Sequence, residues 1–219
     1  MITDQAFILH KRAYKDSSEL IKVMTRDHGV IDVIAKGSRR KNSKLNGQLK
    51  PFLLTEISYL DRSSLKTLIE STQNGTLVNQ PFIKHVSMLY CNELLVLLNL
   101  DEDAVKTIFT AYVKTLKRLS DEKTVELALR KFEWTLCCAS GYELTLPDDI
   151  KDIEFIAFDH QNGLVKDARA QQCQASSFAL FIAEKSINQQ QIKQVSRLMR
   201  AVINYMVNGR EIKSRQLLR

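Results

Sequence analysis

The spacing of apolar residues changes once along this chain of 219 residues, and this change constrains the fold more than any other feature. Up to about residue 73, apolar residues form short runs of strand length. From Phe82 onward they recur at steps of three and four residues, which is typical of amphipathic helices. A polar link with Gly75 and Pro81 separates the two parts. We therefore expect a strand domain at 1–80 and a helical domain at 81–219.

Five strand-like runs lie in the first part of the chain, at 6–14, 20–25, 30–35, 52–60 and 65–72. Asp27, His28 and Gly29 predict a hairpin turn between the second and third runs. Five short strands in about seventy residues fit a small closed barrel of the OB type, with an SH3-like barrel as the alternative. The sequence thus predicts an α+β protein, with an N-terminal five-stranded OB-type barrel followed by a helical C-terminal domain.

The second part of the chain predicts five helices, at 82–98, 105–116, 125–140, 176–186 and 189–207, the third ending at Ser140 and Gly141. Between the third and fourth helices, residues 143–167 are irregular and carry seven acids against two lysines. A short strand at 153–158, with a turn at 161–163, is expected there as an insertion. The end of the chain, 193–219, is basic, with seven Lys and Arg against one acid, Glu211.

The overall charge is +7, and its distribution indicates a polyanionic partner. Residues 1–80 hold 13 Lys and Arg against 8 Asp and Glu, whereas 81–219 hold 19 against 17. A membrane span is not expected because no apolar run approaches about 18 residues. The first residues lack a secretory pattern, so we expect the cytoplasm. Four cysteines without a CxxC pair predict neither a disulfide scaffold nor a zinc site, and we expect no metal or cofactor.

Residues 36–50 form a basic stretch between two predicted strands, and they contain no acid. The candidate DNA-binding residues are its six cations, Lys36, Arg39, Arg40, Lys41, Lys44 and Lys50. A long basic loop on a small barrel suits a phosphate backbone, with Gly37 and Gly47 allowing close approach of the main chain. Ser38 and Ser43 are expected as further donors to phosphate oxygens. A solvated basic loop without a ligand is the alternative, but fifteen residues without a compensating acid repel one another, which favours an anionic partner.

Aromatic stacking platforms are only weakly indicated in the barrel region. Phe7 and Phe52 are expected in the core, whereas Tyr14 and Tyr59 are as consistent with the surface as with the core. This pattern favours binding to the nucleic-acid backbone over reading of bases.

Catalytic motifs are missing from the sequence, which has no phosphate-binding GxxxxGK[ST], no GxGxxG and no HExxH. Asp148, Asp149 and Asp152 match a DDxxD pattern, but the pattern stands alone in an irregular acidic region, so we do not expect a magnesium site. We therefore expect a protein that is not an enzyme.

Short motifs lie in order along nearly the whole chain: Ala35-Lys36-Gly37-Ser38-Arg39-Arg40, Leu49-Lys50-Pro51-Phe52, Tyr90-Cys91-Asn92-Glu93-Leu94-Leu95, Leu129-Arg130-Lys131-Phe132-Glu133, Gly141-Tyr142 and Lys213-Ser214-Arg215. This ordered set resembles the RecO family of recombination mediators. Many family members carry a four-cysteine zinc module after the Gly-Tyr element. This chain has only Cys173 there, so it resembles the members that lack zinc.

The resemblance implies a nucleoid-associated DNA repair and recombination mediator that binds single- and double-stranded DNA and anneals complementary strands. It also implies partnership with RecR and with the acidic C-terminal tail of single-strand-binding protein, and indirect action on the RecA filament by helping to load this recombinase onto gapped DNA. Lys36, Arg39, Arg40, Lys41 and Lys44 would face DNA. Arg130, with Lys131 beside it, would pair with the acidic tail.

Two other functions stay open at this point because phosphate contacts read neither sugar nor base. One is an RNA-binding OB-fold protein, and the other is a protein adaptor with incidental DNA contact. A further hypothesis from opposite charge is that the acidic segment 143–167 docks on the basic loop and regulates it.

Overall fold

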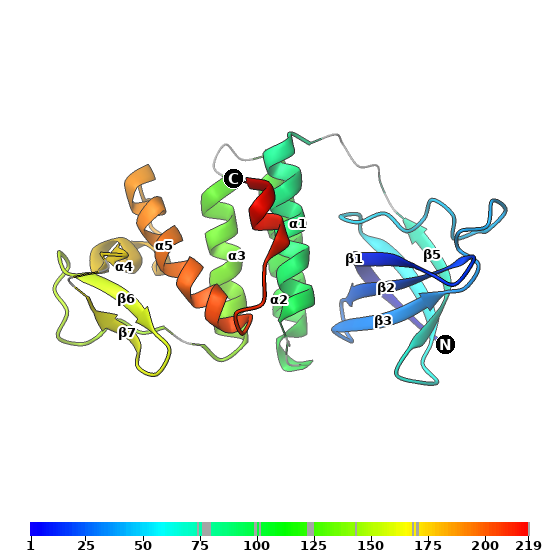
Figure 1. The fold of residues 1–219 in the computed structure, drawn as a ribbon, viewed down its shortest axis with the longest axis horizontal. Coiled ribbons are helices and arrows are strands. Elements are labelled where there is room, and N and C mark those ends of the chain that lie inside the picture. The colour runs from blue at the N-terminus through cyan, green and yellow to red at the C-terminus, as the bar shows by residue number, and fades with distance from the viewer. Residues whose placement is uncertain are drawn as a thin grey trace. The chain divides into compact units, whose positions relative to one another are not determined.

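The computed structural model describes residues 1–73, 75, 80–98, 100, 102–121, 125–142, 144–167, 169 and 171–218 (Figure 1). Contacts divide the chain into two compact units. The first unit joins Met1–Asp121 to the C-terminal Ile212–Arg219, and the second is Glu122–Glu211. The change from strands to helices therefore falls inside the first unit.

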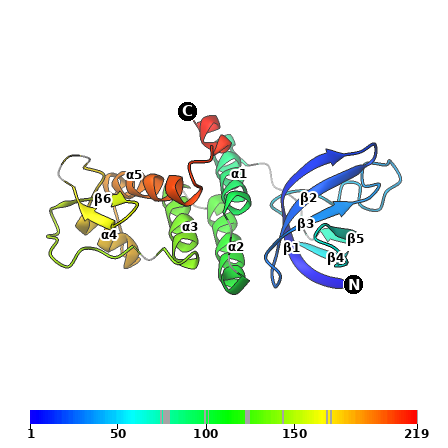
Figure 2. The ribbon, with the colours of Figure 1, turned by 60° about the horizontal axis from the view of Figure 1, so that its bottom comes forward.

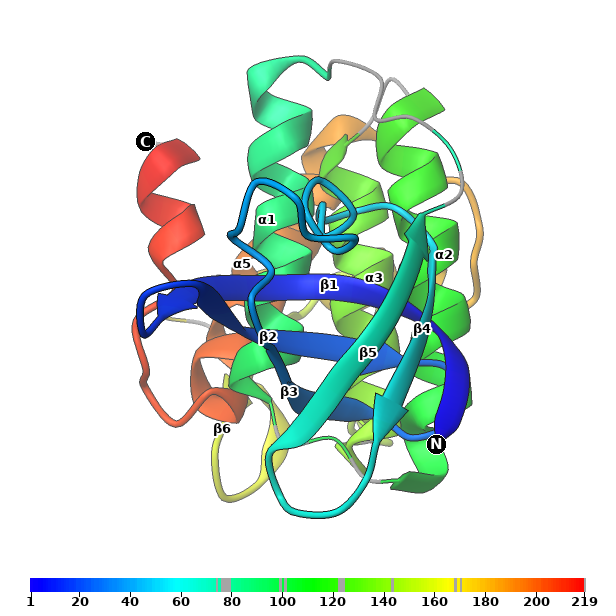
Figure 3. The same cartoon turned by 90° about the vertical axis from the view of Figure 1, so that its right-hand side faces the viewer.

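The N-terminal strands form a closed barrel, so the expected OB-type barrel is confirmed. The strands are β1 (Ile2–Tyr14), β2 (Ser18–Thr25), β3 (Val30–Ala35), β4 (Thr55–Leu60) and β5 (Lys66–Gln73). Their order around the barrel is β1-β2-β3-β5-β4 (Figure 3). All pairs are antiparallel except β3 with β5, which is parallel.

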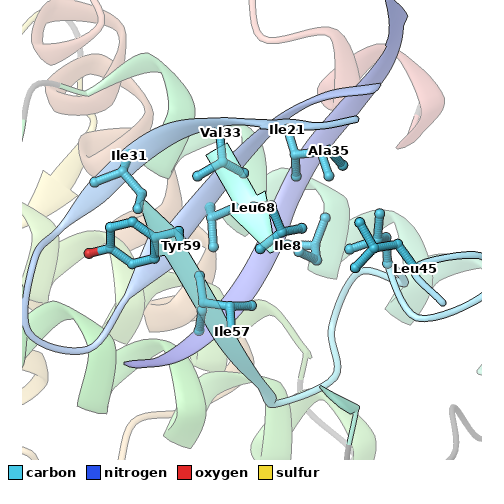
Figure 4. Close-up of a cluster of buried hydrophobic side chains, with 12 residues drawn as sticks. Ile8, Ile21, Ile31, Val33, Ala35, Leu45, Ile57, Tyr59 and Leu68 are labelled. Atoms are coloured by element: carbon cyan, nitrogen blue, oxygen red, sulfur yellow. The ribbon is translucent and has the colours of Figure 1, made fainter. Parts of the chain in front are cut away.

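Alternation of side chains along the strands builds the barrel core. On β3, Ile31, Val33 and Ala35 are buried, whereas Asp32 between them is exposed. The inward side chains meet in one apolar cluster (Figure 4). β1 pairs with both β2 and β4, and its register shifts between Ile8 and His10. A bulge of this kind bends a strand, which lets one strand serve both neighbours.

The fourth expected strand begins later than the sequence indicated. Residues 52–60 were expected to be extended, but β4 starts at Thr55. Phe52 has a φ of +66°, which is incompatible with a strand. Its buried ring instead meets the ring of His85 edge-on, with centroids 5.5 Å apart. Phe52 is therefore a core residue, as expected, but it lies in a turn.

Two helices and a short C-terminal helix complete the first unit: α1 (Phe82–Leu97), α2 (Val105–Asp121) and the 3-10 helix η2 (Lys213–Leu218), with a further 3-10 turn, η1 (Glu102–Ala104), before α2. Asn92 of α1 donates to the carbonyl of Leu9 at 3.0 Å, where β1 is irregular. Tyr112 of α2 donates its hydroxyl proton to the Asn92 side-chain oxygen and packs its ring edge-on against Phe7. These contacts join both helices to β1.

The second unit contains α3 (Val125–Ala139), β6 (Phe155–Asp159), β7 (Gly163–Lys166), β8 (Cys173–Gln174), α4 (Ala175–Ile182) and α5 (Gln189–Met206) (Figure 2). The strands form a small antiparallel sheet in the order β7-β6-β8. The expected strand near 153–158 and its turn are confirmed, with the Asp159 carboxylate accepting from the backbone N–H groups of Gln161 and Asn162. β8 was not expected, because a strand of two residues is too short to show the alternation of apolar and polar side chains.

The five expected helices are all present, within a few residues of the expected bounds. A capping box fixes the N-terminus of α5. The Asn188 side chain accepts from the backbone of Gln191, whose side chain accepts from the backbone of Asn188. Among the helices described here, none is both long enough and apolar enough to cross a bilayer.

Candidate nucleic-acid interface

The basic loop, residues 36–50, leaves the end of β3 and is anchored in the barrel by apolar side chains. Leu45 and Leu49 are 7% and 2% exposed, and both belong to the core cluster. Leu45 lies at one end of that cluster (Figure 4). Ser71 of β5 donates to the carbonyl of Gln48 at 3.2 Å, and Gln73 donates to that of Lys50 at 2.8 Å. The loop is thus held to the barrel surface along its second half.

Successive turns shape the first half of the loop. Gly37 has a φ of +67°, and a Cβ there would meet the side chain of Arg40 at 3.6 Å. The backbone N–H of Arg40 donates to Gly37, and that of Ser43 donates to Arg40. A glycine is favoured at this position because an L side chain rarely adopts a positive φ.

All six cations expected to bind DNA point into solvent. Lys36, Arg39, Arg40, Lys41, Lys44 and Lys50 are exposed. Among the residues that the structure describes, no carboxylate lies within ion-pair distance of any of them. The loop therefore carries six positive charges without carboxylate partners on one short segment. Leu45 and Leu49 anchor this segment in the barrel core.

Ser38 is a correction to the sequence interpretation. It was expected to donate to a phosphate, but its side chain is buried and donates to the Glu19 carboxylate at 2.7 Å. Glu19 also pairs with Lys11 at 3.5 Å. Glu19 is thereby engaged by Ser38 and Lys11 and not by a cation of the loop.

The barrel aromatics offer little surface for stacking. Tyr59, which was consistent with the surface or the core, is fully buried, and burial together with Asp4 raises the pKa of its phenol. Phe7 is buried, as expected. Tyr14 is half-buried, and the Lys15 ammonium lies 5.5 Å from its ring centroid. This arrangement fits a surface that contacts the sugar–phosphate backbone of a nucleic acid and does not stack on its bases.

Further cations missed by sequence reasoning lie beside the loop. The backbone N–H of Arg39 donates to Ser17 at 2.9 Å, and its guanidinium reaches the carbonyl of Lys15 at 3.5 Å. The loop therefore adjoins the β1–β2 turn, in which Lys15 is exposed, and Lys11 and Arg12 are exposed near the end of β1. The available signal was the basic cluster directly after the first apolar run.

A groove with a volume of about 410 Å³ lies on the barrel. Its lining comes from β1, β2, β3 and the β4–β5 turn: His10, Arg12, Leu20, Ile21, Lys22, Asp32, Val33, Ser64 and Leu65. Lys22 pairs with Asp32 at 2.9 Å, and the exposed polar side chains of the groove outside this ion pair are Arg12, His10 and Ser64. OB-fold proteins bind oligonucleotides at the strand 2–3 face and the loop between strands 4 and 5.

Arg130 and Lys131, expected to hold an acidic tail, lie in α3 of the second unit. The Arg130 side chain is 12% exposed and its guanidinium lies 2.5 Å from the carboxylate of Glu133, which is fully buried. A buried carboxylate requires such a partner, because an unpaired buried charge is costly. Lys131 is half-buried. Both side chains are thus only partly exposed, and Arg130 is already engaged by Glu133.

The other candidate reactive groups are two buried cysteine thiols and the carboxylates of the acidic segment. Burial raises the pKa of Cys137 and that of Cys173 to about 12, so both stay protonated thiols at neutral pH. In the DDxxD stretch, Asp149 pairs with Lys166 at 2.9 Å, which lowers the pKa of this exposed carboxyl. Glu154 also pairs with Lys166. Within the described ranges, no three His, Cys, Asp or Glu residues cluster in a way that could hold a metal ion.

The closed barrel and the helices that follow it define an OB-fold protein with a helical C-terminal part. Comparison with known families agrees with this division. The family described as Recombination protein O N terminal matches residues 1–75, and Recombination protein O C terminal matches residues 82–216.

Curated relatives named DNA repair protein RecO match nearly the full chain. The relative from Psychromonas ingrahamii is 33% identical over 225 residues, covering 97% of this chain and 95% of its own length. The relative from Burkholderia pseudomallei is 32% identical, covering 97% and 81%. That from Methylococcus capsulatus is 31% identical, covering 100% and 93%. The chain belongs to the RecO family, and its role lies in DNA repair and recombination.

Proposed function

We propose that this protein is a recombination mediator that binds single- and double-stranded DNA through its basic loop and anneals complementary strands. One observation carries the proposal: six exposed cations without carboxylate partners among the described residues lie on a loop anchored in an OB barrel. The family relatives, named DNA repair proteins, favour DNA over RNA as the ligand.

Charge neutralisation is the physical basis of the proposed annealing. Two DNA strands repel each other through their phosphates, and Lys or Arg contacts remove that repulsion while releasing counterions. The buried Tyr59 and Phe7 offer no stacking surface, so bound bases remain free to pair. No bond is made or broken, so annealing requires no catalytic residue.

The partners proposed with this function are RecR, the acidic C-terminal tail of single-strand-binding protein and, indirectly, RecA. Loading of recombinase onto gapped DNA coated with single-strand-binding protein would follow from engagement of DNA and tail together. Arg130 and Lys131 are the proposed tail contacts. Because Arg130 is paired with the buried Glu133, Lys131 is the side chain better placed to meet a tail without breaking an existing ion pair.

Annealing of complementary DNA oligonucleotides coated with single-strand-binding protein, followed by fluorescence, tests the proposal. We expect wild type to accelerate annealing and Arg39→Ala/Arg40→Ala/Lys41→Ala to lose the acceleration. A matched control removes three exposed lysines elsewhere, Lys114→Ala/Lys117→Ala/Lys185→Ala. The control should retain activity if position matters and net charge alone does not.

Salt dependence gives a second readout. Each lost phosphate contact should reduce the slope of log affinity against log salt by about 1, so the loop variant should lose about 3. A preference for RNA of matched length would contradict the proposal in favour of an RNA-binding protein. Partner binding that survives loop neutralisation, without any annealing by wild type, would indicate an adaptor.

A further inference from the structure

α5 of the second unit presents a row of cations on its exposed face. Lys193, Arg197 and Arg200 are exposed and follow one another at steps of four and three residues, so they lie on one side of the helix. The opposite side is apolar and buried, with Val195, Leu198 and Val202 in the core. Burial of that side fixes the direction in which the cations point. We call Lys193, Arg197 and Arg200 the α5 cation row.

The row borders a shallow pocket of about 370 Å³. Only polar residues line it: Glu126, Gln172, Lys193, Ser196, Arg197 and Arg200. The Glu126 carboxylate accepts from the Ser196 hydroxyl at 2.7 Å and from the Gln189 side chain at 3.3 Å. The carboxylate in the pocket is thus held by neutral groups. In the part of the chain that the structure describes, the three cations have no ion-pair partner.

The spacing and chemistry of the row match a sugar–phosphate backbone. With a rise of about 1.5 Å per residue, Lys193 and Arg197 are separated by about 6 Å along the axis, and Arg197 and Arg200 by about 4.5 Å. Such steps are comparable with the separation of consecutive phosphates along a strand. Arg clusters also bind acidic peptide motifs, but peptides usually add apolar anchors that fill pockets, and all the residues that line this pocket are polar. Nucleic acid is therefore the occupant that this surface favours.

We propose that the α5 cation row is a second DNA-backbone site, separate in the chain from the basic loop, and that it holds one strand while the basic loop holds its complement. This inference rests on the proposed function, because it assigns the second of the two strands that annealing requires. Two sites on one protein raise the effective concentration of each strand near the other, so annealing gains from both.

Binding and annealing are compared for wild type and three full-length variants. The row variant is Lys193→Gln/Arg197→Gln/Arg200→Gln, the loop variant is Arg39→Gln/Arg40→Gln/Lys41→Gln, and the matched control is Lys114→Gln/Lys117→Gln/Lys185→Gln. All replaced side chains are exposed, so circular dichroism and melting should be unchanged. A labelled single-stranded oligodeoxynucleotide is the probe, read by fluorescence anisotropy over a salt series.

We expect the row variant to lose about tenfold in DNA affinity and about 3 in salt slope, and to lose annealing acceleration, while the control changes less than about twofold. Glu126→Gln should raise affinity about twofold, because it removes the acid beside the row and keeps a group that can accept from Ser196.

The outcomes separate this inference from the proposed function. Loss in the loop variant with an unchanged row variant overturns the second site and leaves the proposed function standing. Failure of wild type to bind or anneal DNA overturns the proposed function itself. Equal loss in the control and row variants overturns the site in favour of net charge. An acidic peptide bound by wild type and lost by the row variant, with DNA affinity unchanged, assigns the row to a peptide and overturns it as well.

Discussion

Glu93 and Ser214 are joined by two hydrogen bonds across 121 residues of sequence. The Glu93 carboxylate in α1 accepts from the Ser214 backbone N–H at 2.8 Å and from its hydroxyl at 2.6 Å. It also accepts from the backbone N–H of Lys213 at 2.8 Å. These donors open the helix η2, whose first N–H groups have no partner within a helix. The Glu93 carboxylate thus holds the C-terminal helix η2 against α1 in the first unit.

Replacement of Glu93 should release this C-terminal helix. Charge-assisted hydrogen bonds contribute about 1.5–3 kcal/mol each, and part is regained from water at this half-buried site, so we expect Glu93→Ala to lower the free energy of unfolding by about 2 kcal/mol. Urea denaturation measures the loss. Glu56→Ala, at an exposed strand position, serves as control and should change stability by less than about 0.5 kcal/mol. Equal effects would refute the anchoring role of Glu93.

The leucine anchor of the basic loop should couple barrel stability to DNA binding. Leu49→Ala removes a buried side chain and should cost about 2–4 kcal/mol. At temperatures where the variant stays folded, DNA affinity should also fall, although no charge is lost, because the loop loses its anchor. Ile153→Ala, at a side chain 76% exposed in the second unit, is the control. Unchanged affinity in folded Leu49→Ala would show that the loop does not need its anchor to bind.

Asn92 and Tyr112 form a buried polar contact between the helices and β1, and their substitutions should not be additive. Asn92→Ala removes the donor to the Leu9 carbonyl and the acceptor of the Tyr112 hydroxyl. Tyr112→Phe keeps the ring that packs against Phe7. We expect the double variant to be more stable than the sum of single losses predicts, by about 1 kcal/mol or more. Additive losses in thermal or urea unfolding would exclude the coupling.

The acidic segment should show a pH response set by Lys166. Its ammonium lowers the pKa of Asp149, so the stabilisation is present above the carboxyl's unfolded pKa and is lost as pH falls through the lower folded pKa. Lys166→Gln should raise the pKa of Asp149 toward its usual value. Asp159 is an internal control, since the N–H groups of Asn162 and Gln161 lower its pKa. Carboxyl NMR titration measures both, and a parallel shift of Asp159 would contradict this assignment.

Local patterns in the sequence predicted most elements of the fold. The alternation in residues 30–35 placed β3, and the three- and four-residue spacing of apolar residues placed the helices. The same reasoning extended β4 back to Phe52, because apolar character does not reveal a positive φ. It also left Tyr59 undecided between surface and core. Whether a strand face points into the core depends on neighbouring strands that are distant in sequence, so the local pattern could not place the Tyr59 side chain.

The candidate site, like the fold, was predicted from the sequence only in part. The composition of residues 36–50 was sufficient to single out six cations, because charge is a property of the residues themselves. Whether each charge is free depends on partners. Ser38 is buried against Glu19, and Arg130 is paired with Glu133. The α5 cation row was visible only as part of a basic C-terminal stretch until the helix aligned its members beside Glu126.

The sequence by itself determined the order of the five barrel strands and the five α-helices, the hairpin turn at 27–29 and the basic loop, because those depend on residues within a few positions of each other. Only the tertiary structure decided the closure of the barrel through the parallel β3–β5 pair and the return of η2 to Glu93. It also decided which cations have carboxylate partners. Each of these depends on contacts between segments far apart in the chain, where the entropy of closing a long loop is offset by burial and hydrogen bonding that no local pattern records.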